Sequence, residues 1–149
     1  MTDSEAALSI GDRDPNLAEI LDRGLDEYNF AATGTSKADQ DSFSIKVSTP
    51  TGEIIGGLTA WTWAGLCGIS MLWVHQDHRK AGWGAKILGA AETEARRRGC
   101  DRVCVSSFTF QAPGFYQKYG YIETGRTLGI PGGGEDVHMF KHLQPGADH

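Results

Sequence analysis

Two glycines stand where an apolar run gives way to basic residues and then to a helical pattern. Residues 69–74 read Ile-Ser-Met-Leu-Trp-Val, and residues 79–84 read Arg-Lys-Ala-Gly-Trp-Gly. The N-terminus of a helix has free backbone N–H groups and the positive end of the helix dipole. Glycines at such an end allow a phosphate to approach the backbone. Because Arg79 and Lys80 add positive charge, the stretch predicts a pyrophosphate-binding turn.

Known phosphate loops fit this turn poorly. A Walker A loop needs Gly-Lys-Ser/Thr, whereas Ala-Lys-Ile follows Gly84. A dinucleotide fingerprint needs a third glycine and an acidic residue at the end of the next strand, where this chain has Ser106 and Ser107. Taken alone, the turn also fits any α/β protein in which two glycines connect a strand to a helix and bind nothing.

The elements around the turn follow from hydrophobic spacing and from Gly, Pro and Asp signals. Asp14 and Pro15 predict the start of an amphipathic helix that ends near Tyr28. A second helix is predicted from Gly82 to about Arg98, with Glu92 facing water. A third spans residues 112–119. Strands are predicted at residues 7–10, 42–47, 53–62, 66–74, 102–107, 121–128 and 137–143.

The strand at 66–74 is apolar on both faces, which predicts a central strand covered on both sides. Gly56 and Gly57 predict a bulge or a close backbone approach in the strand before it. The strand–helix–strand order predicts that strands 66–74 and 102–107 run parallel. Strand 137–143 is expected to close the sheet. The fold class is α/β (α+β).

Composition sets the class of protein. The chain has 149 residues with 40% hydrophobic and 22% charged residues, which predicts one globular domain over 1–143 and a polar tail over 144–149. Three unpaired cysteines and the lack of a signal peptide or membrane span predict a cytoplasmic protein with reduced thiols and no metal. The net charge of −5 argues against a nucleic-acid partner.

Two sequence blocks in register resemble the GNAT N-acetyltransferase superfamily. Arg79-Lys-Ala-Gly-Trp-Gly84 resembles its Arg/Gln-x-x-Gly-x-Gly/Ala acetyl-CoA motif, and Val74 matches the apolar end of the preceding strand. Gln111-Ala-Pro-Gly-Phe-Tyr116 with Lys-Tyr-Gly-Tyr after Gln117 resembles the second hallmark of the family. The order of the predicted elements matches along almost the whole chain, as in small stand-alone bacterial members.

The resemblance implies a mostly antiparallel mixed sheet with a splayed parallel central pair and helices on both faces. It implies that backbone amides of residues 80–85 bind the CoA pyrophosphate and that pantetheine pairs with Trp73 and Val74. Tyr116 is implied as the acid that protonates the leaving thiolate; the alternative is a buried packing aromatic. The implied CoA-binding residues are Trp73, Val74, Arg79, Lys80, Ala81, Gly82, Trp83, Gly84, Ala85, Thr109, Ala112 and Tyr116. Thr109 departs from the family, because many members have Asn there.

The general base and the acceptor amine are less determined. Many members have a Glu on the central strand, but residues 66–74 contain none. His138 is the first candidate, and a water relay without a dedicated base is equally compatible; Glu27, Glu53 and His75 are further candidates.

Residues 1–60 hold eleven Asp/Glu and four Lys/Arg, whereas residues 61–149 hold eight Asp/Glu and ten Lys/Arg. With Glu27, Tyr28 and Asn29 as acceptor-binding candidates, this acidic part predicts a cationic amine.

The sequence thus predicts direct transfer of an acetyl group from acetyl-CoA to a small amine in a ternary complex. Two alternatives stay open: acetylation of a protein or peptide amine, and a regulatory domain that binds CoA without catalysis. Neither nucleic acid nor a membrane is an expected partner, and a homodimer is compatible with the family.

Overall fold

The computed structural model describes residues 5–144. The chain divides into two compact units, Met1–Lys37 and Ala38–His149, and each is described by itself. The single domain over 1–143 stays a prediction, and residues 145–149 of the predicted tail lie outside the described residues. Within the described part, no helix has the length and apolarity needed to cross a membrane.

The first unit contains α1 (Pro15–Thr33), which begins as predicted. The Asp14 side chain accepts a hydrogen bond from the Leu17 N–H at 3.1 Å. The predicted end near Tyr28 is wrong by five residues. The helix continues until Gly34, whose left-handed backbone (φ 70°) ends it while its N–H donates to the Phe30 carbonyl. Because glycine adopts this conformation without steric cost, Gly34 is the stop signal.

The strand predicted at residues 7–10 is wrong. These residues have no regular secondary structure, and Leu8 and Ile10 are exposed. Alternation over four residues specifies a face of a strand but supplies no partner, and an unpaired strand gains no ladder hydrogen bonds.

The second unit is built on one six-stranded sheet of order β1-β2-β3-β4-β6-β5. The strands are β1 (Gln40–Ser48), β2 (Ile54–Trp63), β3 (Leu66–Val74), β4 (Arg102–Phe108), β5 (Ile122–Ile130) and β6 (Gly134–His142). All neighbours are antiparallel except β3 and β4, which are parallel as predicted. The last strand does not close the sheet, because β6 lies between β4 and β5 and leaves β5 at the edge.

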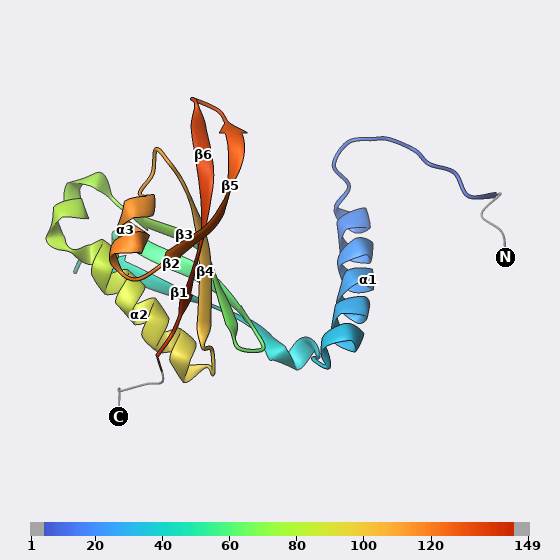
Figure 1. The fold of residues 1–149 in the computed structure, drawn as a ribbon, viewed down its shortest axis with the longest axis horizontal. Helices are drawn as coiled ribbons and strands as arrows, with labels where there is room; N and C mark the ends of the chain where they lie inside the picture. Colours follow the sequence, from blue (N-terminus) through green and yellow to red (C-terminus); the bar gives the residue numbers. More distant parts are fainter. Residues whose placement is uncertain (1–4, 145–149) are drawn as a thin grey trace. The chain divides into compact units, whose positions relative to one another are not determined.

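Two helices cover one face of this sheet. Helix α2 (Trp83–Arg97) packs against β1, β2 and β3, and α3 (Pro113–Lys118) packs against β4. The buried residues of α2 are Ile87, Leu88, Ala91, Glu92 and Ala95. The four apolar ones join Tyr116, Tyr121 and the inward residues of the strands in one core. Figure 1 shows the helices and the sheet of this unit. The predicted α/β fold class with a mixed sheet is confirmed.

Glu92 does not face water as predicted. It is 9% exposed and accepts hydrogen bonds from the Tyr121 hydroxyl at 2.8 Å and from Lys141 Nζ at 2.9 and 3.1 Å. A charged residue is buried only when it is paired and hydrogen-bonded, and these two partners satisfy both carboxylate oxygens. The cluster Glu92–Tyr121–Lys141 therefore links α2 to the half of the sheet formed by β4, β5 and β6.

Strand β3 is central in the sheet, and within its own unit a bulge divides its apolar residues between the two faces. The pairing Thr59↔Met71 is followed by Ala60↔Ile69, so Ser70 is an extra residue, or bulge. The bulge changes the alternation, and Ile69 and Val74 both reach the core on either side of it. Met71 and Trp73 are exposed as a result. The apolar residues of β3 are thus divided between the face that packs on the core of this unit and the opposite face.

The glycines of β2 allow the close backbone approach predicted for them. A Cβ at Gly57 would lie 2.5 Å from the Ile45 carbonyl oxygen, and one at Gly56 would lie 3.0 Å from that of Trp73. A register shift between Val47 and Ser48 adds the predicted bulge at this place. Gly56 therefore allows β2 to lie close to the C-terminal end of β3, and Gly57 allows it to lie close to β1.

Candidate active site

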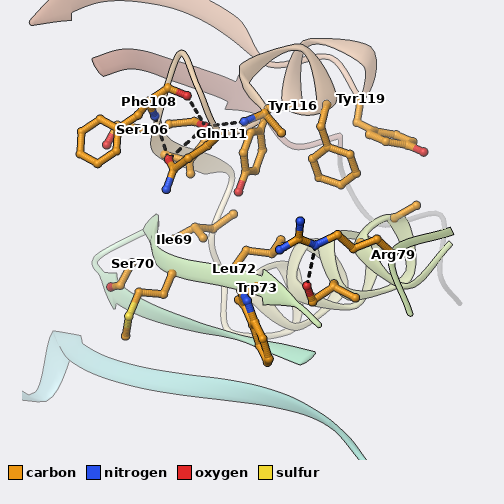
Figure 2. A pocket seen from close by; sticks show the side chains of 18 of the residues that line it. Ile69, Ser70, Leu72, Trp73, Arg79, Ser106, Phe108, Gln111, Tyr116 and Tyr119 are labelled. Atoms are coloured by element: carbon orange, nitrogen blue, oxygen red, sulfur yellow. Dashed lines mark hydrogen bonds between the residues drawn. The ribbon is translucent and has the colours of Figure 1, made fainter. Parts of the chain in front are cut away.

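The central parallel strands separate soon after they meet. Strands β3 and β4 pair only at Leu66↔Arg102, Cys67↔Val103 and Gly68↔Cys104. Beyond this point a cavity of about 890 Å³ lies between residues 69–74 of β3 and residues 105–108 of β4. Figure 2 shows β3 on one side of this space and the residues of β4 and α3 on the other. Backbone N–H and C=O groups of the two separated edges have no partner strand there, so an extended polar ligand can bind them.

The N-terminus of α2 borders the cavity. Gly82 is its N-cap in the left-handed conformation (φ 79°), and no described side chain caps this end. The first N–H groups of α2 are therefore available to an anion. The last turn of the preceding 3₁₀ helix (Gln76–Ala81) contains three basic residues, His78, Arg79 and Lys80. Backbone donors, helix dipole and cations thus act at one place.

The Arg79 side chain folds back onto β3. Its Nε donates to the Val74 carbonyl at 2.9 Å, as Figure 2 shows. This bond fixes the guanidinium beside the end of β3 and leaves the terminal nitrogens for a ligand, since Arg carries five N–H donors. Gly84 supplies close packing, because a Cβ there would lie 3.4 Å from the Phe115 ring of α3. The two helices are therefore in contact beside the cavity.

Tyr116 of α3 contributes a buried phenol to the cavity. It is 7% exposed, and its ring packs edge-on against Phe115 and Tyr121 at 5.2 and 5.7 Å between centroids. Figure 2 shows its hydroxyl directed across the cavity toward β3. Burial raises the pKa of the Tyr116 phenol above its usual value near 10. The phenol therefore keeps its proton at neutral pH and is able to donate it.

The loop before α3 is fixed by side-chain hydrogen bonds. Gln111 Oε1 accepts from the Phe108 N–H at 2.8 Å, and Ser107 Oγ accepts from the Ala112 N–H at 3.3 Å. Ser107 is buried, and Pro113 begins the helix. These bonds set the direction of α3 and hence the position of Tyr116.

Most of the predicted CoA residues lie at the cavity. Those that line it are Trp73, Val74, Arg79, Gly82, Gly84, Ala85, Ala112 and Tyr116. Four others, Lys80, Ala81, Trp83 and Thr109, are not among the lining residues. Trp83 packs partly against the core, with Lys86 Nζ 4.6 Å from its ring. Thr109 Oγ1 accepts from the Glu135 N–H at 3.0 Å, so it joins its loop to β6.

The predicted base lies on β6, and the predicted acceptor residues lie on α1. His138 lies on β6, where its Nε2 is 3.0 Å from the Thr127 hydroxyl, and it is not among the lining residues. Glu27, Tyr28 and Asn29 belong to α1, in the other unit of the chain. The roles of these four residues stay predictions.

Several lining residues were not predicted. They include Ser106, Phe108, Phe110, Tyr119 and Asp136. The strand pattern of β6 held a signal for one of them: Val137 and Met139 are 0% and 2% exposed, so Asp136 faces the opposite side of the sheet. Its presence at the cavity depends on the pairing Phe108↔Asp136, which joins residues 28 positions apart and has no local sequence signal.

Comparison with known proteins agrees with this arrangement. The sequence model described as "Acetyltransferase (GNAT) domain" matches residues 39–123. The acetyltransferase Atu2258 of Agrobacterium fabrum is 31% identical over 137 residues, which are 92% of this chain and 90% of that protein. The crystal structure of an acetyltransferase from Bacillus cereus ATCC 14579 has a TM-score of 0.80 at 29% identity, covering 91% of this chain and 98% of that chain.

A further relative is the blasticidin-S acetyltransferase of Streptomyces morookaense. It is 42% identical over 74 residues, which are 47% of this chain and 52% of that protein, so the match spans about half of its length. The matched domain contains both sequence blocks discussed above and the separated strands β3 and β4, and acetyltransferases of this kind use acetyl-CoA as donor. On this evidence the chain belongs to the GNAT family of N-acetyltransferases.

Proposed function

We propose that the chain transfers the acetyl group of acetyl-CoA directly to a small, cationic amine in a ternary complex. The observation that carries the proposal is the juxtaposition of an uncapped helix N-terminus, two separated strand edges and a buried phenol around one cavity. The helix N-terminus can bind a pyrophosphate, and the separated strand edges can hydrogen-bond the amides of pantetheine. The phenol can donate its proton to a leaving thiolate.

The residues act in sequence. The first amides of α2, with Arg79 and Lys80, bind the pyrophosphate. Pantetheine pairs with the Trp73–Val74 edge of β3, where a backbone N–H polarises the thioester carbonyl. The lone pair of the neutral amine attacks the carbonyl carbon, the C–S bond breaks, and the thiolate takes the proton of Tyr116. The amine gives up its own proton to water or to a base such as His138, and solvent reprotonates the tyrosine.

The acceptor class rests on two supports. Residues 1–60 have a large excess of Asp and Glu over Lys and Arg, which favours cationic molecules. The relative from Streptomyces morookaense is named for a small-molecule acceptor, blasticidin S. Glu27, Tyr28 and Asn29 remain the candidates for acceptor binding in the acidic part.

The test is release of free thiol from acetyl-CoA with a panel of polyamines, aminoglycosides, blasticidin S and neutral amino acids. We expect turnover with cationic members of the panel, and a 10- to 100-fold lower kcat for Tyr116→Phe, within the range of general acid catalysis. The phenol makes no hydrogen bond to another described residue, so this variant should fold as stably as the wild type. CoA binding without turnover on the whole panel would favour a regulatory domain, and unchanged kcat in Tyr116→Phe would exclude the phenol as acid.

A further inference from the structure

Asp136 is the acidic residue of the cavity, and its charge is uncompensated. The charged residues that line the cavity are Arg79 and Asp136. Arg79 is bonded to the Val74 carbonyl near the helix end. Asp136 is half-buried, and within residues 5–144 its carboxylate has neither an ion-pair partner nor a side-chain hydrogen bond. A carboxylate in a cavity with no cation beside it is a site for a cationic ligand.

The neighbouring carboxylate shows the contrast. Glu135 precedes Asp136 on the same strand, and its Oε1 accepts from Arg126 Nη1 at 2.7 Å. Arg126 also bonds both oxygens of Glu123 at 2.9 Å. Glu135 is therefore neutralised within the protein and lies outside the lining of the cavity. The same strand thus offers a paired and an unpaired acidic residue one position apart.

Aromatic rings lie beside the free carboxylate. Phe108 is directly opposite Asp136 in the β4–β6 ladder, so the two side chains share one face of the sheet. The Phe110 ring stacks on that of Phe108 with centroids 5.3 Å apart, and Phe110 is 64% exposed. Both phenylalanines line the cavity. Because the partner strand β6 buries Val137 and Met139 on the side of the helices, Asp136 and Phe108 face away from Tyr116 and α2.

We infer that Asp136 binds the cationic group of the acceptor, with Phe108 and Phe110 covering the carbon skeleton attached to it. The inference rests on the proposed function and assigns the acceptor to the sheet face opposite the helices. A carboxylate and an ammonium form a charge-assisted hydrogen bond, and an aromatic face adds attraction to the same cation. Asp136 is then a specificity-determining residue that selects cations, while the proton of the reacting amine leaves by another route.

The experiment compares wild type with Asp136→Asn, with Glu135→Gln as the matched control. Both variants lose one negative charge from adjacent positions, but the charge of Glu135 is already paired on the surface, where such pairs contribute little. Steady-state kinetics are measured against a polyamine, an aminoglycoside and blasticidin S. We expect Asp136→Asn to raise the acceptor KM at least tenfold and to leave the KM for acetyl-CoA within twofold. Glu135→Gln should change both by less than twofold.

A binding measurement separates this inference from the proposed function. Thermal shift with the same amines, in the presence of CoA, reports binding without turnover. Binding by wild type that is lost in Asp136→Asn supports the inference even if no acetyl transfer is detected. Turnover with an unchanged acceptor KM in Asp136→Asn overturns the inference and leaves the acetyltransferase activity intact. Failure of wild type to bind any cationic amine of the panel also overturns it.

Discussion

The buried cluster of Glu92, Tyr121 and Lys141 leads to a quantitative prediction about stability. Replacing Glu92 by Ala removes the acceptor of the Tyr121 hydroxyl (2.8 Å) and of the Lys141 ammonium (2.9 Å). Breaking a buried ion pair from one side costs about 3–5 kcal/mol. The side chain of Lys141 is 24% exposed, so water reaches the ammonium left behind and the lower end of the range applies. We expect Glu92→Ala to lower the free energy of unfolding by about 3 kcal/mol.

Urea denaturation followed by tryptophan fluorescence measures this change from the midpoint and slope of the transition. Glu92→Gln keeps the volume and one acceptor oxygen, so its cost should be smaller, about 1–2 kcal/mol. Glu123→Ala is the exposed control. It removes a carboxylate from Arg126, which keeps Glu135 as a partner, and its cost should stay below about 1 kcal/mol. A Glu92→Ala cost equal to that of Glu123→Ala would refute the structural role assigned to the buried cluster.

Two further predictions concern the helix end and the buried thiol. Gly84→Val places a branched side chain in the first turn of α2, beside the cavity and the Phe115 ring. It should raise the Kd of acetyl-CoA at least tenfold in calorimetric titration. An unchanged Kd would show that the pyrophosphate does not bind at this helix end. Burial raises the pKa of the Cys67 thiol to about 12, so above pH 9 the unfolded chain loses a proton that the folded protein keeps. The free energy of unfolding should therefore fall as pH rises, by about 1.4 kcal/mol per unit at most from this thiol, and Cys67→Ala should reduce that slope in denaturation at pH 8 to 10.

The elements that the sequence predicted best are those with local start and stop signals. Helix α2 has a glycine at its start, apolar residues at helical spacing and Gly99 after its end, and the structure agrees within a residue at each boundary. The strand–helix–strand order was enough to predict that β3 and β4 are parallel. The end of α1 was missed because the residues after Tyr28 form no clear apolar stripe, although Gly34 was present as a stop signal.

The parts that failed depend on contacts between distant residues. Periodicity places Glu92 next to the buried stripe of α2 but does not reveal Lys141, its partner 49 residues away. Residues 7–10 alternate without a neighbouring strand. The CoA side of the cavity could be predicted from the sequence, because two contiguous sequence blocks form it. The other side depends on the β4–β6 pairing, which brings Asp136 to Phe108. The local sequence pattern thus predicts which face of an element a residue lies on, but its neighbours in the fold depend on tertiary pairing.

The short seam between β3 and β4 also has a mechanical consequence. The two halves of the sheet, β1–β3 and β4–β6–β5, meet as a wedge whose apex is the Gly68↔Cys104 pair. From Gly68 to Val74 the strand is about 20 Å long, so a rotation of about 3° between the halves displaces the open end by about 1 Å. The Glu92–Tyr121–Lys141 cluster connects α2 to the half formed by β4, β6 and β5, and its hydrogen bonds oppose this rotation. A small change in angle at the three residue pairs that join β3 and β4 therefore produces a larger change in the distance between Tyr116 and β3.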